Sequence, residues 1–481
     1  MTLAEELYTV MKSFVAVALE FFVIPFLITA IYAWHCRATS WRVVPDGIPW
    51  FFGGSTETGA RASWFAQIRA HLRDFSQGTN FVSQGYKRYS KVGRPFISPS
   101  FVTWQPEVVL PPSQVRWLVE QPESVLSIDR ALKKDLEFDY TTPTAWSFTR
   151  PFHVEAINKL RLDNLVEDMS EEVQESIDRE WGLDTTKWKD VNIEDTMRNV
   201  LVQITARVFV GPPLCNNKTY LQSAHDFIAA LSLRAILISL SPELLRPLAG
   251  WYFSRPLKRL NAACAAHTVP LIEQAMSHRR TSDQATMPLP KTLLEQTARL
   301  ALRSSDPKDS APFSIASRLL ALTFVAVHTS THSLVNALVD VVSPPAGLHV
   351  FETLREEAEA VYTSCKGVWT KSAVAQLVKT DSALRESLRL STFKAKGVER
   401  IVVAAQEVTL PDGTFLPPGA KVGVPVLAMH RDEDFYTAAG TFVPFRFAEG
   451  VKAAEGDVSG HVELINSSET FLAFGHGRHA W

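Results

Sequence analysis

Between Pro312 and Pro344 the chain runs for thirty-one residues without a proline or a glycine. If this stretch is wholly helical, it is about 46 Å long, because each residue adds about 1.5 Å. Leu319 to Val327 is apolar on nearly every face of such a helix, so the segment belongs in a core rather than at a surface. These nine residues are too few to span a membrane. We therefore expect a mostly helical body in which this segment is buried.

A polar block, His328 to Ser333, follows directly in the same predicted helix. Buried hydroxyls and imidazoles must find partners, since each unsatisfied group costs about 1–3 kcal/mol. In one interpretation, the hydroxyls bond back to carbonyls four residues earlier and the histidines meet other core groups. In the other, the helix passes a ligand cavity and offers donors to it, with a local kink. His328 and His332 also have the i, i+4 spacing of metal ligands, although a zincin glutamate and a third ligand are not apparent.

Composition excludes several classes of protein. Of the 481 residues, 46% are hydrophobic and the net charge is −2, which is a globular composition and not a disordered or collagenous one. The near-neutral charge argues against a nucleic-acid partner, since such proteins usually carry a basic excess. No CxxC pair occurs, so a disulfide scaffold or a zinc ribbon is not expected and the chain suits the reducing cytosol. The four cysteines are Cys36, Cys215, Cys264 and Cys365.

The N-terminal region contains an apolar run from Phe14 to Trp34, twenty-one residues with Glu20 as the one charge. As a helix it is about 31 Å long, enough to cross the hydrocarbon layer of about 30 Å. A secretory signal peptide fits less well, because the run is too long and no small-residue cleavage site follows. Arg37 and Arg42 come next, so the positive-inside rule places the rest of the chain in the cytosol.

We therefore expect three parts: a membrane anchor at 1–36, a proline-containing linker at 37–52 and one large domain at 53–481. Surface helices are predicted at 160–181, 191–210 and 256–280 from apolar residues at helical spacing, with few alternating strands between 54 and 345. The segment 408–416 around Asp412-Gly413 is typical of a hairpin, and 421–426 is expected to continue the same small sheet. The predicted fold class is mainly α with small β-sheets.

Three segments near the C-terminal end combine charge with special backbone. Glu386 and Arg389 are i, i+3 neighbours on a predicted helix and can pair, although a surface ion pair is the simpler interpretation. Arg446 lies among aromatic residues in a segment broken by Pro444, where a buried guanidinium would need a carboxylate. The segment 471–480 is an apolar strand that runs into a loop with two glycines, arginine and histidine, suited to backbone close to an anionic or planar ligand. An ordinary turn explains that loop equally simply.

Taken in this order, these segments resemble the cytochrome P-450 haem-thiolate monooxygenases. The motifs are ExxR at Glu386/Arg389, FxPxRF at 442–447 and FGxGRHA at 474–480. The resemblance spans essentially the whole chain. Several segments are similar in sequence to those of fungal members that modify terpenoids and related secondary metabolites. These segments are 150–153, 207–217 and 326–330.

The resemblance implies a role for each motif. Glu386, Arg389 and Arg446 would form a structural salt-bridge network behind the haem. The central helix would lie on the oxygen side, with Thr329 and Ser330 guiding protons and His328 where many members carry an acid. The loop residues Phe474, Gly475, Gly477 and Arg478 would bind the cofactor, with Arg478 at a haem propionate. His153 is a further candidate for a propionate contact.

The sequence departs from the family pattern at Trp481, where the family places its axial cysteine directly after Ala480. The thiolate pushes electron density onto the iron and favours O–O cleavage, and an indole cannot replace it. No metal ligand is therefore assigned, and the domain is expected to be C-terminally incomplete. A truncated or mis-spliced gene model, a degenerate copy and a protein with another iron ligand, such as His476 or His479, are the three interpretations.

Three functions remain open from the sequence. The first is an anchored haem-dependent monooxygenase of the endoplasmic reticulum, with a single-pass anchor and a cytosolic catalytic domain. It would oxidise a lipophilic, terpenoid-like secondary metabolite in a fungal pathway, with electrons from NADPH through a membrane-bound cytochrome reductase. The second is a catalytically inactive anchored binding protein that keeps the apolar pocket. The third is a metal-dependent hydrolase built on His328 and His332.

Overall fold

The computed structural model describes most of the chain from Pro45 onward. The described residues are 45, 47–51, 64–101, 103, 105–142, 151–160, 165–241, 244–281, 290–304, 306–344, 348–448 and 462–480. The predicted anchor and most of the predicted linker lie outside them, so those two predictions stay open.

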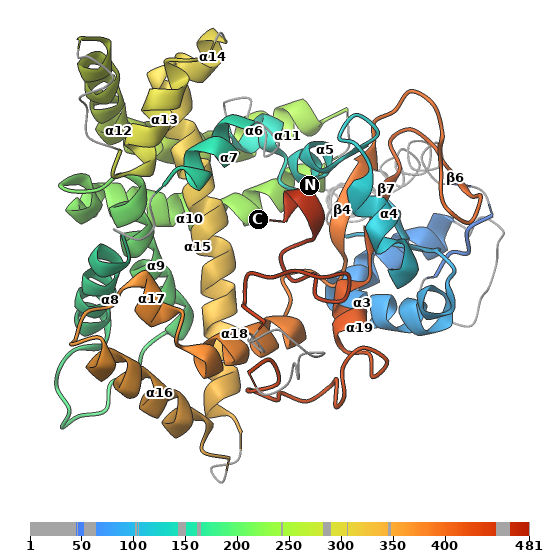
Figure 1. Ribbon diagram of the computed structural model, residues 1–481. Coiled ribbons are helices and arrows are strands. Elements are labelled where there is room, and N and C mark those ends of the chain that lie inside the picture. The colour runs from blue at the N-terminus through green and yellow to red at the C-terminus, as the bar shows by residue number, and fades with distance from the viewer. Residues whose placement is uncertain are drawn as a thin grey trace, which may run out of the picture.

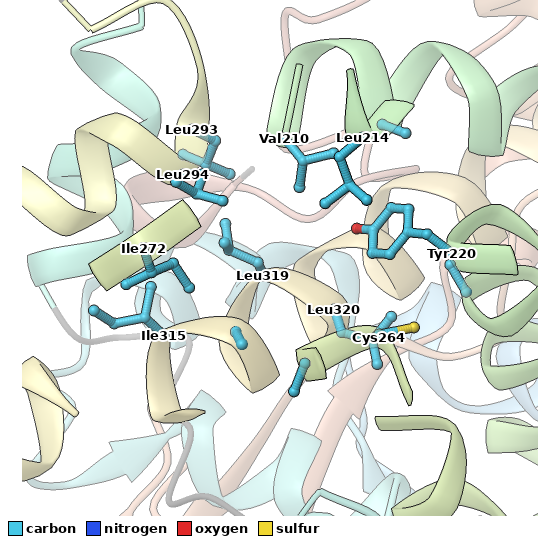
Figure 2. Close-up of a cluster of buried hydrophobic side chains, with 14 of the residues drawn as sticks. Val210, Leu214, Tyr220, Cys264, Ile272, Leu293, Leu294, Ile315, Leu319 and Leu320 are labelled. Carbon is cyan, nitrogen blue, oxygen red and sulfur yellow. The ribbon is translucent and has the colours of Figure 1, made fainter. Parts of the chain in front are cut away.

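The helical part is built around α15 (Pro312–Val342), the long helix at the centre of Figure 1. Its ends lie within one residue of the predicted ones, because Pro312 suits a first helical turn and the helix ends before Pro344. Ile315, Leu319 and Leu320 of this helix are buried in one apolar cluster with side chains of α9, α10, α12 and α13 (Figure 2). The prediction of a core helix is confirmed.

The surrounding helices follow the predicted segments closely. The expected helices at 160–181, 191–210 and 256–280 correspond to α8, α9 and α12, and Asn192 caps α9 by accepting a hydrogen bond from the Asp195 amide at 3.1 Å. The remaining helices before α15 are α3 (Trp64–Arg88), α4 (Val115–Glu120), α5 (Ile128–Asp135), α6 (Phe138–Thr141), α7 (Pro151–Asn158), α10 (Lys218–Ser239), α11 (Arg246–Phe253), α13 (Leu293–Ala301) and α14 (Pro307–Ser310). The bounds of the three expected helices are α8 (Leu165–Trp181), α9 (Ile193–Phe209) and α12 (Arg255–Thr281). After α15 come α16 (Val350–Ser364), α17 (Lys371–Val374), α18 (Val378–Leu390) and α19 (Val426–His430).

A five-stranded sheet lies beside the helical part, on the right in Figure 1. Its strand order is β1-β2-β7-β4-β3, with β2 parallel to β7 and the other neighbours antiparallel. Val108 of β2 lies opposite Val422 of β7, and both side chains are buried. The strands are β1 (Phe96–Ser98), β2 (Glu107–Val109), β3 (Leu126–Ser127), β4 (Gly397–Val402) and β7 (Lys421–Val424).

Among the described residues before 345 strands are few, as expected, and the expected placement of 421–426 is corrected. The first part of the chain contributes β1, β2 and β3, whose residues are all buried, so they lack the alternation by which half-buried strands are recognised. The hairpin at 408–416 is confirmed as β5 (Val408–Thr409) and β6 (Phe415–Leu416). However, β7 does not extend that hairpin, because it pairs with β2 and β4 in the larger sheet.

Two described helices, α10 and α15, are long and apolar enough to cross a membrane by length and composition alone. In α15 the most apolar window is 56% buried inside the protein, as expected of a core helix. These two helices therefore add little to the case for membrane association, and the run at 14–34 lies outside the described residues.

Candidate functional site

A cavity of about 680 Å³ lies beside the middle of α15. Its lining combines aliphatic and aromatic side chains with a set of charged ones. The residues from α15 are Phe324, Val325, His328, Thr329 and His332, and the others come from α3, α5, α10, the sheet and the segment 393–396. A mostly apolar pocket with a few convergent polar groups is typical of a small-molecule site.

The polar block of α15 satisfies both interpretations of the sequence. The hydroxyl of Thr329 donates to the Val325 carbonyl at 2.8 Å, and that of Thr331 donates to the Val327 carbonyl at 2.7 Å. Hydroxyl bonding to the i−4 carbonyl is therefore confirmed. At the same time, Thr329, His328 and His332 line the cavity, whereas Ser330 does not. The polar block therefore forms part of the cavity wall, and its threonine hydroxyl groups are hydrogen-bonded to carbonyls of the same helix.

The two histidines of α15 are held by aromatic rings. His328 stacks on Phe324 with ring centroids 5.2 Å apart, and His332 lies 5.6 Å from the Phe393 ring. Desolvation lowers the pKa of His328, and the positive charges of Arg198 and His332 lower it further. His328 is therefore neutral at pH 7. Within the described residues no group of three or more His, Cys, Asp or Glu side chains is arranged to hold a metal ion.

Glu386 sits at the centre of a buried ion-pair network on α18. Its carboxylate accepts two hydrogen bonds from Arg389, at 2.7 and 2.8 Å, and one from Arg446 at 3.0 Å. Glu386 and Arg389 are fully buried, whereas Arg446 is 14% exposed. The backbone amide of Val443 donates to the same carboxylate at 3.0 Å. The structure thus brings together the three residues of the ExxR and FxPxRF motifs.

This network reaches the glycine loop through His430. The Arg389 guanidinium donates to the carbonyls of His430 and Ala439. The His430 ring lies 3.1 Å from the Arg389 carbonyl at Nδ1 and accepts from the Leu472 amide at Nε2, 2.9 Å away. Burial lowers the pKa of His430 to about 3, so the ring is neutral and can accept at Nε2. The position of Leu472 is therefore tied to the Glu386 network.

The segment 471–480 does not begin with the apolar strand expected from the sequence. Phe471 and Leu472 are buried but lie in no strand, a turn follows at Ala473 and Phe474, and a 3₁₀ turn runs from Gly477 to His479. Gly477 has φ +75°, and a Cβ there would lie 3.1 Å from the Cβ of Val119 on α4. Glycine is therefore needed at this position both for its backbone conformation and for the close approach to α4. The Phe474 ring packs on Phe393 at 5.2 Å.

A basic cluster lies where the 3₁₀ turn meets β4. Arg478 donates to the Gln121 carbonyl at 2.5 Å, and the buried Arg400 donates to the Glu399 carbonyl at 2.9 Å. The pKa of His479 is lowered by desolvation and then by the charge of Arg400, while Glu123 opposes the shift. His479 Nε2 is buried without a hydrogen bond, 3.7 Å from a Glu123 oxygen. Sequence reasoning did not find Arg400, because only the β4 pairing brings it to this loop.

This cluster fits the edge of a group with two carboxylates, which is how a haem presents its propionates. The charges of Arg400 and Arg478 act on His479 beside Glu123, and the His479 Nε2 atom is buried without a hydrogen bond. The described cysteines are not placed to ligate an iron in this cavity. Cys215 and Cys264 are buried in the helical core, and desolvation raises the pKa of Cys264 to about 12, which disfavours a thiolate. Cys365 lies at the end of α16, and no described cysteine lines the cavity.

The remaining predicted residues are placed as follows. His153 lies in α7, but nothing is described of its side chain. His476 Nδ1 is hydrogen-bonded to Ser467 at 2.9 Å. Gly475 has a left-handed φ of +81°. Trp481 lies outside the described residues.

Comparisons with known proteins agree on one family. A family model described as cytochrome P450 matches residues 120–480. The cytochrome P450 monooxygenase polB of Polytolypa hystricis is 29% identical over 435 residues, which cover 87% of this chain and 82% of the relative. The cytochrome P450 monooxygenase lnaC of Aspergillus flavus is 31% identical over 423 residues, covering 86% and 79%. The structure of retinoic acid bound cyanobacterial CYP120A1 matches with a TM-score of 0.56 and 18% identity, covering 83% of this chain and 82% of that one.

Proposed function

The chain belongs to the cytochrome P450 family, and on that premise we propose that it is a haem-dependent monooxygenase of a lipophilic secondary metabolite. The observation that carries the proposal is the cavity lined by His328 and Thr329 of α15 and by Phe393, against whose ring Phe474 of the glycine loop packs. The curated relatives are fungal monooxygenases, which supports a fungal biosynthetic pathway. A terpenoid-like substrate is the class we propose.

Several residues of this chain would hold the haem. Arg400 and Arg478 would neutralise its propionates and His479 would donate a hydrogen bond to one of them, with His153 as a further candidate. Phe474 would lie against the macrocycle, and Gly475 and Gly477 let the loop backbone come close. The Glu386 network, with Arg389 and Arg446, fixes the loop through His430 and Leu472. When bound, haem supplies the activation of dioxygen and the transfer of electrons, which amino-acid side chains do not provide.

The α15 residues would manage protons and water. The Thr329 hydroxyl donates to the Val325 carbonyl, which leaves the lone pairs of Oγ1 free to accept a hydrogen bond from the cavity side. The neutral His328 imidazole can donate a hydrogen bond at one ring nitrogen and accept one at the other. Ser330, one residue on, would support this relay from outside the cavity lining. Phe324 and Val325 keep the neighbouring space apolar and so limit the entry of water.

We further propose the partners and location that the family implies. Electrons would come from NADPH through a cytochrome reductase. Residues 1–36 would anchor the chain in the endoplasmic reticulum as a single pass, with 37–52 as the linker and the domain from 53 onward in the cytosol. The apolar run at 14–34 supports this arrangement.

A second function is favoured by the position of the cysteines. Because no described cysteine lines the cavity, the same pocket would serve an inactive, anchored binding protein of a lipophilic metabolite. Such a protein would bind the metabolite without turnover.

A matched pair of threonines tests the monooxygenase proposal. The Trp481→Cys chain, reconstituted with NADPH and a cytochrome reductase, is supplied with ¹⁸O₂ and extracts of lipophilic metabolites, and incorporated label is measured by mass spectrometry. We expect Thr329→Val to lower labelled product by about tenfold to a hundredfold, since proton delivery contributes at least that much. Thr331→Val, which loses the same i−4 bond away from the cavity, should keep its activity. Equal rates in the two variants would contradict the relay, and saturable binding without label would favour the binding protein.

A further inference from the structure

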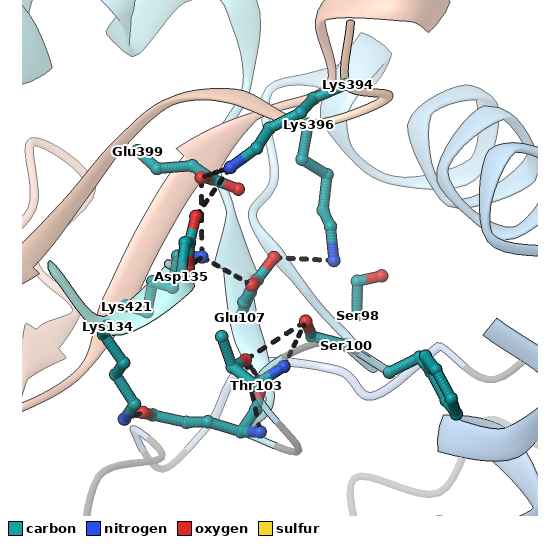
Figure 3. A network of polar contacts seen from close by, with 12 residues as sticks. Ser98, Ser100, Thr103, Glu107, Lys134, Asp135, Lys394, Lys396, Glu399 and Lys421 are labelled. Atoms are coloured by element: carbon teal, nitrogen blue, oxygen red, sulfur yellow. Dashed lines mark hydrogen bonds and ion pairs between the residues drawn. The ribbon is translucent and has the colours of Figure 1, made fainter. Parts of the chain in front are cut away.

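One wall of the cavity carries six charged side chains, called here the charged wall (Figure 3). Three are carboxylic acids and three are lysines, so the formal charges balance. They come from β2, α5, β4, β7 and the segment between α18 and β4, which are far apart in the sequence. The members are Glu107, Asp135, Lys394, Lys396, Glu399 and Lys421.

The charged wall is held together around Lys421. The Lys421 ammonium lies 2.6 Å from Asp135, 3.0 Å from Glu107 and 3.4 Å from Glu399. Its side chain is only 2% exposed. All three of its N–H groups therefore face a carboxylate, and this lysine has no donor left for a ligand. Lys421 accounts for the cohesion of the wall.

The other two lysines, Lys394 and Lys396, have fewer polar partners than Lys421. Lys394 lies 2.6 Å from both Asp135 and Glu399, and Lys396 lies 2.6 Å from Glu107 and 2.9 Å from the Pro99 carbonyl. Each ammonium has three N–H groups, so each keeps one donor without a partner among the described residues. The Lys394 side chain is 49% exposed although it lines the cavity. Lys394 is therefore accessible to a ligand in the cavity, whereas Lys421 is covered.

The carboxyl groups of the wall are not equivalent. The charges of the lysines hold the pKa of Glu107 to about 2, against the effect of its burial, and hold that of Asp135 well below its usual range. Burial instead raises the pKa of Glu399, despite Lys394 and Lys421 beside it. Glu399 is thus the carboxyl group of the wall that is most easily protonated.

Asp74 is the remaining acidic group of the cavity lining. Its carboxylate accepts the Phe101 amide at 2.8 Å, and burial raises its pKa. A cationic ligand would be expected if Asp74, rather than the two lysines, set the preference of the cavity. The number of free donors instead favours an anionic ligand, because Lys394 and Lys396 of the charged wall each offer one free ammonium N–H group.

We propose that the substrate is a lipophilic carboxylic acid whose carboxylate docks on Lys394 and Lys396. Its hydrocarbon part would lie along Leu132, Leu136, Ile236 and Val325 toward Thr329, which all line the same cavity. This inference rests on the proposed function in that it names the substrate class for that site. It also gives the orientation of the substrate: the acid end is held at the sheet, and the far end is presented to α15.

Calorimetric titration of the full chain with three ligands of one chain length tests the proposal. The ligands are dodecanoic acid, dodecan-1-ol and dodecylamine, which differ only in the head group. We expect the acid to bind about tenfold to a hundredfold more tightly than the alcohol, as for a charge-assisted hydrogen bond. Lys394→Gln and Lys396→Gln should each remove most of that preference and leave the affinity for the alcohol unchanged.

Two further variants keep the result interpretable. Lys187→Gln is the matched control, because Lys187 is exposed and is not among the residues that line the cavity. Lys394→Arg retains the positive charge and should retain the preference, with the fold of every variant checked by circular dichroism. Equal binding of acid and alcohol by the parent chain, or tighter binding of the amine, would overturn the proposal. So would equal effects of Lys394→Gln and Lys187→Gln.

Haem content and labelled product are measured separately on the same preparations. An acid preference without haem or product in the Trp481→Cys chain would leave the substrate class standing and defeat the monooxygenase. Product formation without an acid preference would support the monooxygenase and contradict the proposed substrate class. The two proposals can therefore fail independently.

Discussion

Replacement of Arg389 by alanine is expected to cost several kcal/mol of folding free energy. Arg389 and Glu386 are both fully buried, and the guanidinium makes two hydrogen bonds to that carboxylate. Removal of one partner of a buried pair costs about 3–5 kcal/mol. The carbonyls of His430 and Ala439 also lose their donor, so we expect a loss near 5 kcal/mol. That is a large share of the roughly 5–15 kcal/mol that stabilises an ordinary domain.

An exposed pair on α16 provides the control. Arg355 and Glu359 are also joined at 2.7 Å, but their side chains are 69% and 62% exposed. Such i, i+4 surface pairs contribute about 0.3–0.5 kcal/mol, so Arg355→Ala should leave stability almost unchanged.

The assay is urea unfolding of the full chain, followed by circular dichroism. Arg389→Ala should lower the midpoint strongly, whereas Arg355→Ala should not. If Arg389→Ala yields no folded protein, Arg389→Lys keeps the charge without the forked geometry and should give an intermediate midpoint. Shifts of equal size for Arg389→Lys and Arg355→Ala would refute the view that burial of this pair organises the loop.

Two other perturbations follow from the same structure. Burial lowers the pKa of His71 to about 4, whereas a histidine in the unfolded chain has a pKa of about 6.5. Because the unfolded chain therefore binds a proton at a higher pH than the folded one, the free energy of unfolding falls as the pH decreases from about 6.5 to about 4. The urea midpoint should therefore depend less on pH between 5 and 6.5 in His71→Asn than in the parent, and equal slopes would argue against a buried neutral His71. Gly477→Ala should cost about 1–2 kcal/mol for the left-handed backbone and more for the approach to Val119, whereas Gly413→Ala, with φ +88° and no neighbour within 4 Å, carries only the backbone cost. Urea midpoints compare the two, and identical losses would contradict the contact with α4.

The sequence predicted best what depends on local pattern. The ends of α15 follow from the prolines that flank a long run without glycine, and the ExxR pairing follows from helical spacing. The strands β1 to β3 were not predicted, because every residue in them is buried. Their sequences therefore lack the alternation of polar and apolar residues that marks a half-buried strand. The charged wall and Arg400 could not be predicted, because their partners meet only through the strand order β2-β7-β4. His328 and His332 were placed on one face, but only the fold shows that this face lines the cavity.

The reduced, carbon-monoxide-bound absorption spectrum of Trp481→Cys, recorded beside that of the parent chain, tests the proposed haem site most directly. The variant places a thiol at the position where the resemblance to the family implies an axial cysteine. We expect the red-shifted Soret band of a thiolate-ligated haem in the variant, and a histidine-type band or no haem in the parent. Identical spectra from the two chains would contradict the proposal that the Phe474–Ala480 loop forms the thiolate side of a haem site.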